Sequence, residues 1–283
     1  MGNFQIADLL ISEAADPEQK SDLGLSALMT AIAYDQVRFA ILLMERNVDN
    51  EARLGYAEIQ DEHLGIYFEG DKRRSLGSTP LILASLKGQS EVVEYLINQG
   101  VNINSKTEHG ITAVIAAAWA GHSRVVEILL INHCPLDAIP GDGFTALHYG
   151  ALKGHVNVVR LLCESGANIE QTKSLGFTPL LEAALKGNSD VVELLLRYGA
   201  NPSSVAQGVY GMNGFTALHL AAIIGHTRMA TLLIENGCDF EIKTSEGFTA
   251  LEIAEGRGHR EIMRIIHERT NTTRGGKRMC VEA

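Results

Sequence analysis

The chain has 283 residues, of which 46% are hydrophobic and 20% are charged, a composition typical of a folded soluble protein. Its formal net charge of −10 disfavours nucleic acid and anionic membranes as partners. The four cysteines form no CxxC pair, so we expect no disulfides and a cytoplasmic or nuclear location. The longest apolar stretch, residues 111–120, is about half of what a bilayer span needs.

The first predicted element is a helix over residues 1–14, which carries the apolar residues Phe4, Ile6, Leu9, Leu10 and Ile11. We expect residues 1–20 to form a capping helix that shields the end of the structure that follows. This segment has neither the basic stretch of a secretory signal nor the Ser or Thr of an N-myristoylation motif, so no membrane anchor is expected.

A repeated pattern follows and fills most of the chain. Its clearest mark is a Ser or Thr that opens an apolar run, at Ser26, Thr79, Thr112, Thr145, Thr178, Thr216 and Thr249. Successive Thr residues are 33, 33, 33, 38 and 33 positions apart, and the first step of 53 is 33 plus 20. Seven copies in one register predict an array of repeated structural units.

Each copy predicts a turn followed by two antiparallel helices. A Gly just before the opening residue allows a tight turn with positive φ, and the Thr can cap a short Ala-rich helix. A second Gly, such as Gly154, suits a left-handed helix end. A second helix follows, with apolar residues spaced near 3.6, as at Val191, Val192, Leu195 and Leu196. Because no single copy can bury its apolar face, the copies must stack.

The clearest copy contains Gly143-Phe144-Thr145-Ala146-Leu147-His148, then Gly154-His155, then Gly166-Ala167-Asn168. Over residues 21–268 this pattern resembles the ankyrin-repeat family. The resemblance implies an all-α repeat solenoid of stacked helix–turn–helix units with short β-hairpin loops. We expect a monomer, polar first and last copies that act as caps, and a flexible basic tail over residues 269–283.

Two insertions interrupt the period: 20 extra residues within 53–74 and five within 203–212. In repeat solenoids such insertions enter loops on one edge, often the binding edge. The first carries several aromatic residues, among them Tyr67. Two interpretations stay open: the segment contacts a partner through Tyr67, or it is a neutral expansion whose aromatics pack on the first two copies.

Two sets of side chains are candidates for partner binding. The residue before the opening Thr is Phe in four consecutive copies: Phe144, Phe177, Phe215 and Phe248. Seven positions after the Thr, the copies give Leu86, Trp119, Leu152, Leu185 and Ile223. The resemblance implies that both sets face the concave groove through which this family contacts partners. A row of exposed apolar side chains marks a protein interface, with Trp119 as its anchor, although these residues are also common family choices without such a role.

The histidines recur once per copy, at His122, His155, His226 and His259, and again at His148 and His219. One per copy cannot converge on a metal ion, and the resemblance implies turn and inter-repeat hydrogen bonds instead. No phosphate-binding loop, nucleophile elbow or catalytic constellation stands out, so we expect no catalytic, cofactor or metal site.

The predicted function is that of a non-catalytic adaptor that binds a protein partner through the groove and the hairpin loops. Two alternatives use the same surface. One is an inhibitor or regulatory subunit of an enzyme or transcription factor, and the other is a microbial effector.

Overall fold

The computed structural model describes residues 26–46, 48–54, 76–136, 138–141, 143–173, 176–207 and 212–279, with side chains described as far as residue 270. The expected capping helix over residues 1–20 lies outside this part, as do residues 55–75, which include Tyr67 and most of the first insertion. The chain divides into two compact bodies, residues 1–141 and 142–283.

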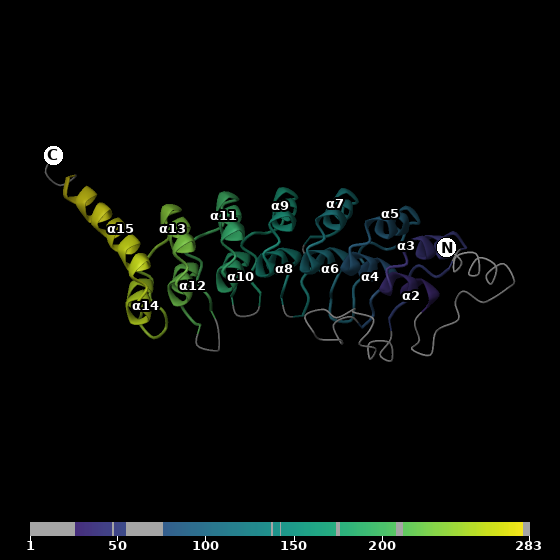
Figure 1. Cartoon of the computed structure of the whole chain (residues 1–283), viewed down its shortest axis with the longest axis horizontal. Helices are drawn as coiled ribbons and strands as arrows, with labels where there is room; N and C mark the ends of the chain where they lie inside the picture. Colours follow the sequence, from purple (N-terminus) through teal and green to yellow (C-terminus); the bar gives the residue numbers. More distant parts are fainter. Residues whose placement is uncertain are drawn as a thin grey trace. The chain divides into compact units, whose positions relative to one another are not determined.

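The described residues of the N-terminal body form three helix pairs (Figure 1). Their first helices are α2 (Ala27–Ala33), α4 (Pro80–Lys87) and α6 (Ala113–Ala120). Their second helices are α3 (Val37–Glu45), α5 (Ser90–Asn98) and α7 (Ser123–Ile131). Each first helix packs against its own second helix and against the first helix of the adjacent pair. The second helices also contact one another in order, so this body has two layers.

The C-terminal body repeats this arrangement with four pairs. Its first helices are α8 (Ala146–Lys153), α10 (Pro179–Lys186), α12 (Ala217–Ile224) and α14 (Ala250–Arg257). Its second helices are α9 (Val156–Glu164), α11 (Ser189–Arg197), α13 (Thr227–Glu235) and α15 (Arg260–Met279). Each body is thus an all-α repeat solenoid, as the period predicts.

The sequence sets the ends of the first helices. The seven predicted opening residues are the N-caps of α2, α4, α6, α8, α10, α12 and α14, and all but Thr112 accept a hydrogen bond from a backbone N–H of the first turn. From α4 onward each first helix ends at a left-handed Gly, as expected. In the first repeat Asp35 has the positive φ that Gly supplies elsewhere.

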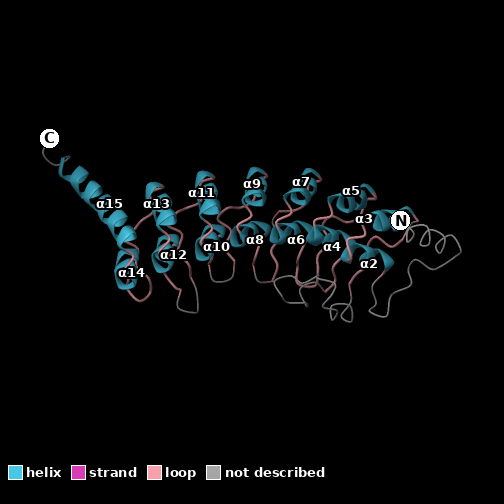
Figure 2. Ribbon diagram, in the orientation of Figure 1, coloured by secondary structure: helices cyan, strands magenta, loops and turns pink. Residues whose placement is uncertain are grey.

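The fold class agrees with the prediction, and the described loops are short hairpin turns that contain no extended strand (Figure 2). The loops reverse direction as hairpins do: Thr107 N–H donates to Ile111 O at 2.9 Å, and Thr244 N–H donates to Phe248 O at 2.9 Å. The arms are too short to add a ladder, and a single antiparallel bridge, Lys106 to Thr112, is found in the described loops.

Side chains at the start of the second helices tie neighbouring repeats together. Gln89 Nε2 donates to Ile32 O at 2.8 Å, and His122 Nε2 lies 3.1 Å from Leu86 O. Asn188 Nδ2 donates to Ala151 O and Leu152 O at 2.9 and 3.0 Å. These bonds reach carbonyls in the last turn of the preceding first helix, where the regular intrahelical bonding ends.

The last helix, α15, continues to Met279 and so includes part of the segment predicted as a basic tail. Arg264, near its start, pairs with Glu261 and Glu268 one turn away on either side, which supports the helical conformation. The polar character expected of the last repeat is present, because Glu252, Glu255, Arg257 and Arg260 are exposed. None of the described helices is long and apolar enough to cross a membrane.

Candidate protein-interaction surface

The residues seven positions after each opening Thr lie in the last turn of the first helices, where they are only partly covered. Trp119, Leu152, Leu185 and Ile223 are half-buried, as a contact row requires. The prediction is wrong for Leu86, which is 8% exposed. It lies in the last turn of α4, which packs against both α2 and α6, so little of its side chain is left for a partner.

The four Phe residues before the opening Thr differ in exposure although they share a register. Phe144 and Phe215 are half-buried, and Phe248 is 48% exposed. The expectation of a contact surface is wrong for Phe177, which is 5% exposed. Its ring lies beside the Lys173 ammonium, 5.4 Å from nitrogen to ring centroid, and its carbonyl oxygen accepts from His148 Nε2 at 3.1 Å. These contacts draw Phe177 into the packing between repeats.

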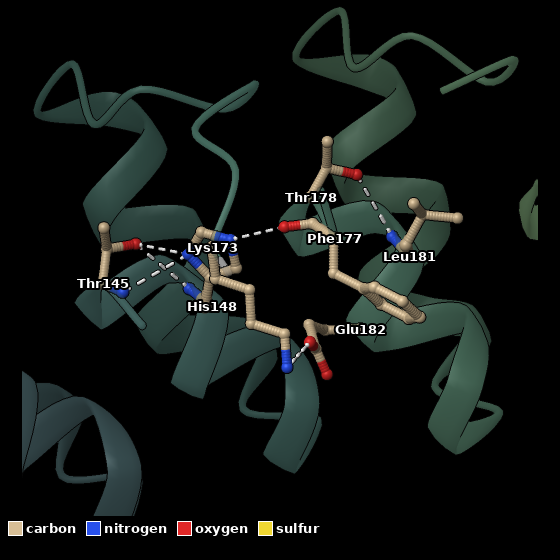
Figure 3. A network of polar contacts seen from close by, with 7 residues as sticks. All are labelled: Thr145, His148, Lys173, Phe177, Thr178, Leu181 and Glu182. Atoms are coloured by element: carbon tan, nitrogen blue, oxygen red, sulfur yellow. Dashed lines mark hydrogen bonds and ion pairs between the residues drawn. The ribbon is translucent and has the colours of Figure 1, made fainter. Parts of the chain in front are cut away.

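A charged pair lies next to Phe177 and was not predicted (Figure 3). Lys173 comes from the loop before α10, and its Nζ is 2.5 Å from Glu182 Oε1. The Glu182 side chain is 1% exposed and that of Lys173 is 15% exposed. The same ammonium lies 3.8 Å from the centroid of the Phe144 ring, within cation–π range.

The alignment of the repeats contains a signal that could have found this pair. Glu182 stands four positions after its opening Thr, where other repeats have Leu83, Tyr149 or Leu220. A carboxylate in an apolar register needs a buried cation nearby. The sequence does not identify Lys173 as that cation, because only the folded loop brings it to α10.

The register eight positions after the opening Thr supplies the last residue of each first helix. In the C-terminal body, Lys153 and Lys186 are exposed at the ends of α8 and α10, and Ile224 is 50% exposed at the end of α12. Together with the half-buried residues that precede them, they form a surface that we call the end strip: Leu152, Lys153, Leu185, Lys186, Ile223 and Ile224.

The histidines form hydrogen bonds within and between repeats, which confirms the prediction for four of them. His148 and His219 complete capping boxes with Thr145 and Thr216, while their Nε2 atoms lie 3.1 and 3.2 Å from the carbonyl oxygens of Phe177 and Phe248. His122 lies against Leu86 O, as described, and His226 Nε2 is 3.1 Å from Ser189 Oγ.

The hydrogen bonds of His219 define the tautomer of its ring. Thr216 N–H points at Nδ1 from 3.1 Å, so the partners assign the ring proton to Nε2. Burial lowers the pKa of His219, and this effect outweighs the opposing effect of the backbone hydrogen bonds. Among the residues that the structure describes, no three His, Cys, Asp or Glu side chains are placed to hold a metal ion.

Three of the cysteines are buried and free. Burial raises the pKa of Cys134 and Cys163 to about 11 and that of Cys238 to about 12. Thiols with such pKa values remain protonated near neutral pH, so they are poor nucleophiles and poor metal ligands.

Comparison with known proteins agrees with this architecture. A family model described as ankyrin repeats in three copies matches residues 1–106, 52–139, 131–206 and 201–274. The crystal structure of the ankyrin repeat domain of Bcl-3, a member of the IkappaB family, has a TM-score of 0.66 and 25% identity. That match covers 86% of this chain and 99% of that domain.

Curated relatives match over shorter segments. The chain is 42% identical over 57 residues to Protein phosphatase 1 regulatory subunit 12A of Mus musculus, which is 20% of this chain and 6% of that protein. It is 32% identical over 68 residues to Notch-regulated ankyrin repeat-containing protein A of Danio rerio, 24% of this chain and 61% of that protein. The chain thus spans less than two thirds of the length of these relatives. With the family model matching along most of the sequence, the chain belongs to the ankyrin-repeat family.

Proposed function

We propose that this chain is a protein-interaction adaptor without catalytic activity, and that it binds a partner through the ends of its first helices and the adjoining loops. One observation carries the proposal. In the C-terminal body, consecutive first helices present incompletely buried aliphatic residues in one register, Leu152, Leu185 and Ile223, and Ile224 is exposed beside the last of them. Helices α8, α10 and α12 pack side by side, so these residues lie in a row.

Such a row fits a protein partner better than a small molecule. Scattered surface aliphatics are ordinary, but apolar residues aligned over three helices, with polar residues at the edge, have the composition of an interface. The free, buried cysteines support the cytoplasmic or nuclear location expected from the sequence.

A second candidate is a regulatory or inhibitory subunit, which would use the same surface. The similarity to a protein phosphatase 1 regulatory subunit and to the ankyrin domain of an IkappaB family member favours this alternative. The two functions differ in the number of partners. An adaptor holds two proteins at once, so deleting residues 56–72 should release one partner while the other stays bound, whereas a regulatory subunit should inhibit or activate one enzyme directly.

Affinity capture with matched variants tests the row. Leu185→Ala with Ile223→Ala should lose the partners that the unmodified chain retains. The control, Leu161→Ala with Leu232→Ala, removes equally half-buried leucines from the second helices α9 and α13 and should keep them. Circular dichroism melting of both variants separates lost binding from lost folding. Equal capture by both folded variants would refute binding through the row.

A further inference from the structure

The end strip carries two charged helix ends followed by an apolar one, and this order favours one kind of ligand. Lys153 ends α8, Lys186 ends α10 and Ile224 ends α12. All three are exposed, and the helices that carry them pack in this order. The next helix, α14, ends at Arg257, but Glu252 and Glu255 are exposed on it, so the positive surface stops before α14.

Packing fixes the spacing between these ends. Neighbouring helices lie about 8–10 Å apart, so equivalent side chains on adjacent repeats are separated by roughly 10 Å. A peptide in the extended polyproline II conformation rises about 3.1 Å per residue with three residues per turn, so every third side chain faces the same way and advances by roughly 9 Å, close to the spacing of the helix ends. A peptide that crosses α8, α10 and α12 in order therefore presents one side chain in three to each helix end.

We propose that the end strip binds an extended segment of a partner protein with the pattern acidic-x-x-acidic-x-x-apolar, in one chain direction or the other. The two acidic residues pair with Lys153 and Lys186, and the apolar residue covers Ile224. The intervening side chains contact Leu152, Leu185 and Ile223. This inference rests on the proposed function, because it assumes that the row is the binding surface.

Charge complementarity selects an acidic partner. The chain as a whole carries −10, so an acidic segment gains nothing from its overall field, and attraction must come from local cations. The end strip supplies them at a fixed interval. A nucleic acid carries a phosphate at every nucleotide, far more negative charge than two lysines can neutralise on a chain of net charge −10, so a peptide with two acidic residues fits the end strip better.

A structural role alone explains only part of the pattern. A lysine in the last turn of a helix stabilises the negative end of the helix dipole, which accounts for Lys153 and Lys186 without a ligand. It does not account for Ile224, which has no charge and leaves half of its surface in water at the same position. An apolar partner residue would remove that surface from water.

Selection from a phage library of random 12-residue peptides against the full chain tests the pattern. The unmodified chain should enrich acidic residues three positions apart, with an apolar residue three positions beyond one of them. K153E/K186E should select Lys or Arg at the first two positions, and I224K should convert the third from apolar to acidic. The control R160E/R197E makes the same charge change on the second helices α9 and α11 and should select the original pattern.

Fluorescence anisotropy with one selected peptide gives the magnitude. Converting two exposed ion pairs into repulsions should raise Kd about tenfold. Circular dichroism should show that each variant folds, and a variant that does not is replaced by K153Q/K186Q, whose selected peptides should lose the acidic residues.

Two failures can be told apart. Selected peptides that depend on Leu185 and Ile223 but carry no spaced acidic residues would uphold the adaptor function and overturn this inference. No enrichment, or peptides indifferent to both the end-strip charges and the row, would overturn the two together.

Discussion

Replacing Lys173 with Met tests how this fold tolerates a charge in its core. Met keeps most of the volume of Lys and removes its ammonium, which lies 2.5 Å from Glu182 Oε1. Glu182 is 1% exposed, so water cannot take over the role of the ammonium. Breaking a buried pair in this way costs about 3–5 kcal/mol, and we expect K173M to lose that much unfolding free energy.

The double variant K173M/E182L should behave quite differently. Leucine is the residue that other repeats carry at this register, as at Leu83 and Leu220. Exchanging a buried pair for apolar residues of similar size is often neutral or stabilising by about 1–4 kcal/mol. The double variant should therefore equal or exceed the original chain, and the mutant cycle should give a coupling energy of several kcal/mol, on the order of the K173M loss itself.

Urea unfolding followed by circular dichroism at 222 nm measures these changes as shifts in midpoint at constant slope. Because repeat arrays can unfold in stages, hydrogen exchange of the α8 and α10 amides should show that the loss is centred on this site. The reference is R124M, which breaks the exposed pairs of Arg124 with Glu94 and Glu127 and should shift the urea midpoint far less than K173M. If K173M costs no more than R124M, or if the double variant is as unstable as K173M, the account of this pair is wrong.

Three further predictions concern single positions. His133→Gly should raise the unfolding free energy by about 1 kcal/mol in urea titrations, because His133 has the left-handed φ of 57° that favours Gly. Asp35→Gly should raise the unfolding free energy less, since it also removes the hydrogen bond that Asp35 accepts from Gln89. The pKa of His219 is lowered in the folded chain, so the unfolded chain binds the proton first and the unfolding free energy should fall as pH drops below about 6.5. His219→Gln should flatten this part of the profile of stability against pH. An unchanged profile would contradict the burial argument. At pH 8, iodoacetamide should modify the buried thiols of Cys134, Cys163 and Cys238 far more slowly in the folded chain than in urea. Peptide mass spectrometry measures the rates, and equal rates in the two conditions would contradict the prediction.

The sequence predicted the helix pairs well because their boundaries depend on local chemistry. The opening Thr caps its helix and the following Gly ends it, so Thr145 and Gly154 could be placed on the helix ends before any packing was known. The exposure of side chains was predicted less well, because it depends on the neighbouring repeat. Phe177 and Phe248 are identical in register, yet Phe177 is buried beside Lys173 while Phe248 is half exposed in the last loop that the structure describes.

The length of the last helix was harder to predict than the positions of the other helices. The basic residues after 268 suggested a solvated tail, but the helix continues to Met279 because no proline interrupts it and residues one turn apart, as in Arg264 with Glu268, attract each other. Periodicity, which indicated the other helices, stops before this segment, so a pattern search has nothing to detect there.

The side chains at the start of the second helices determine how ligand binding affects the stability of neighbouring repeats. The side chains of Gln89, His122 and Asn188 form the hydrogen bonds described above with the repeat immediately before them. Local unfolding within a body is therefore expected to spread from one repeat to the next. A ligand laid across three helix ends would oblige those repeats to open together. Ligand binding should therefore slow hydrogen exchange in all three repeats together, and not only at the contact residues, which hydrogen exchange can show for each repeat separately.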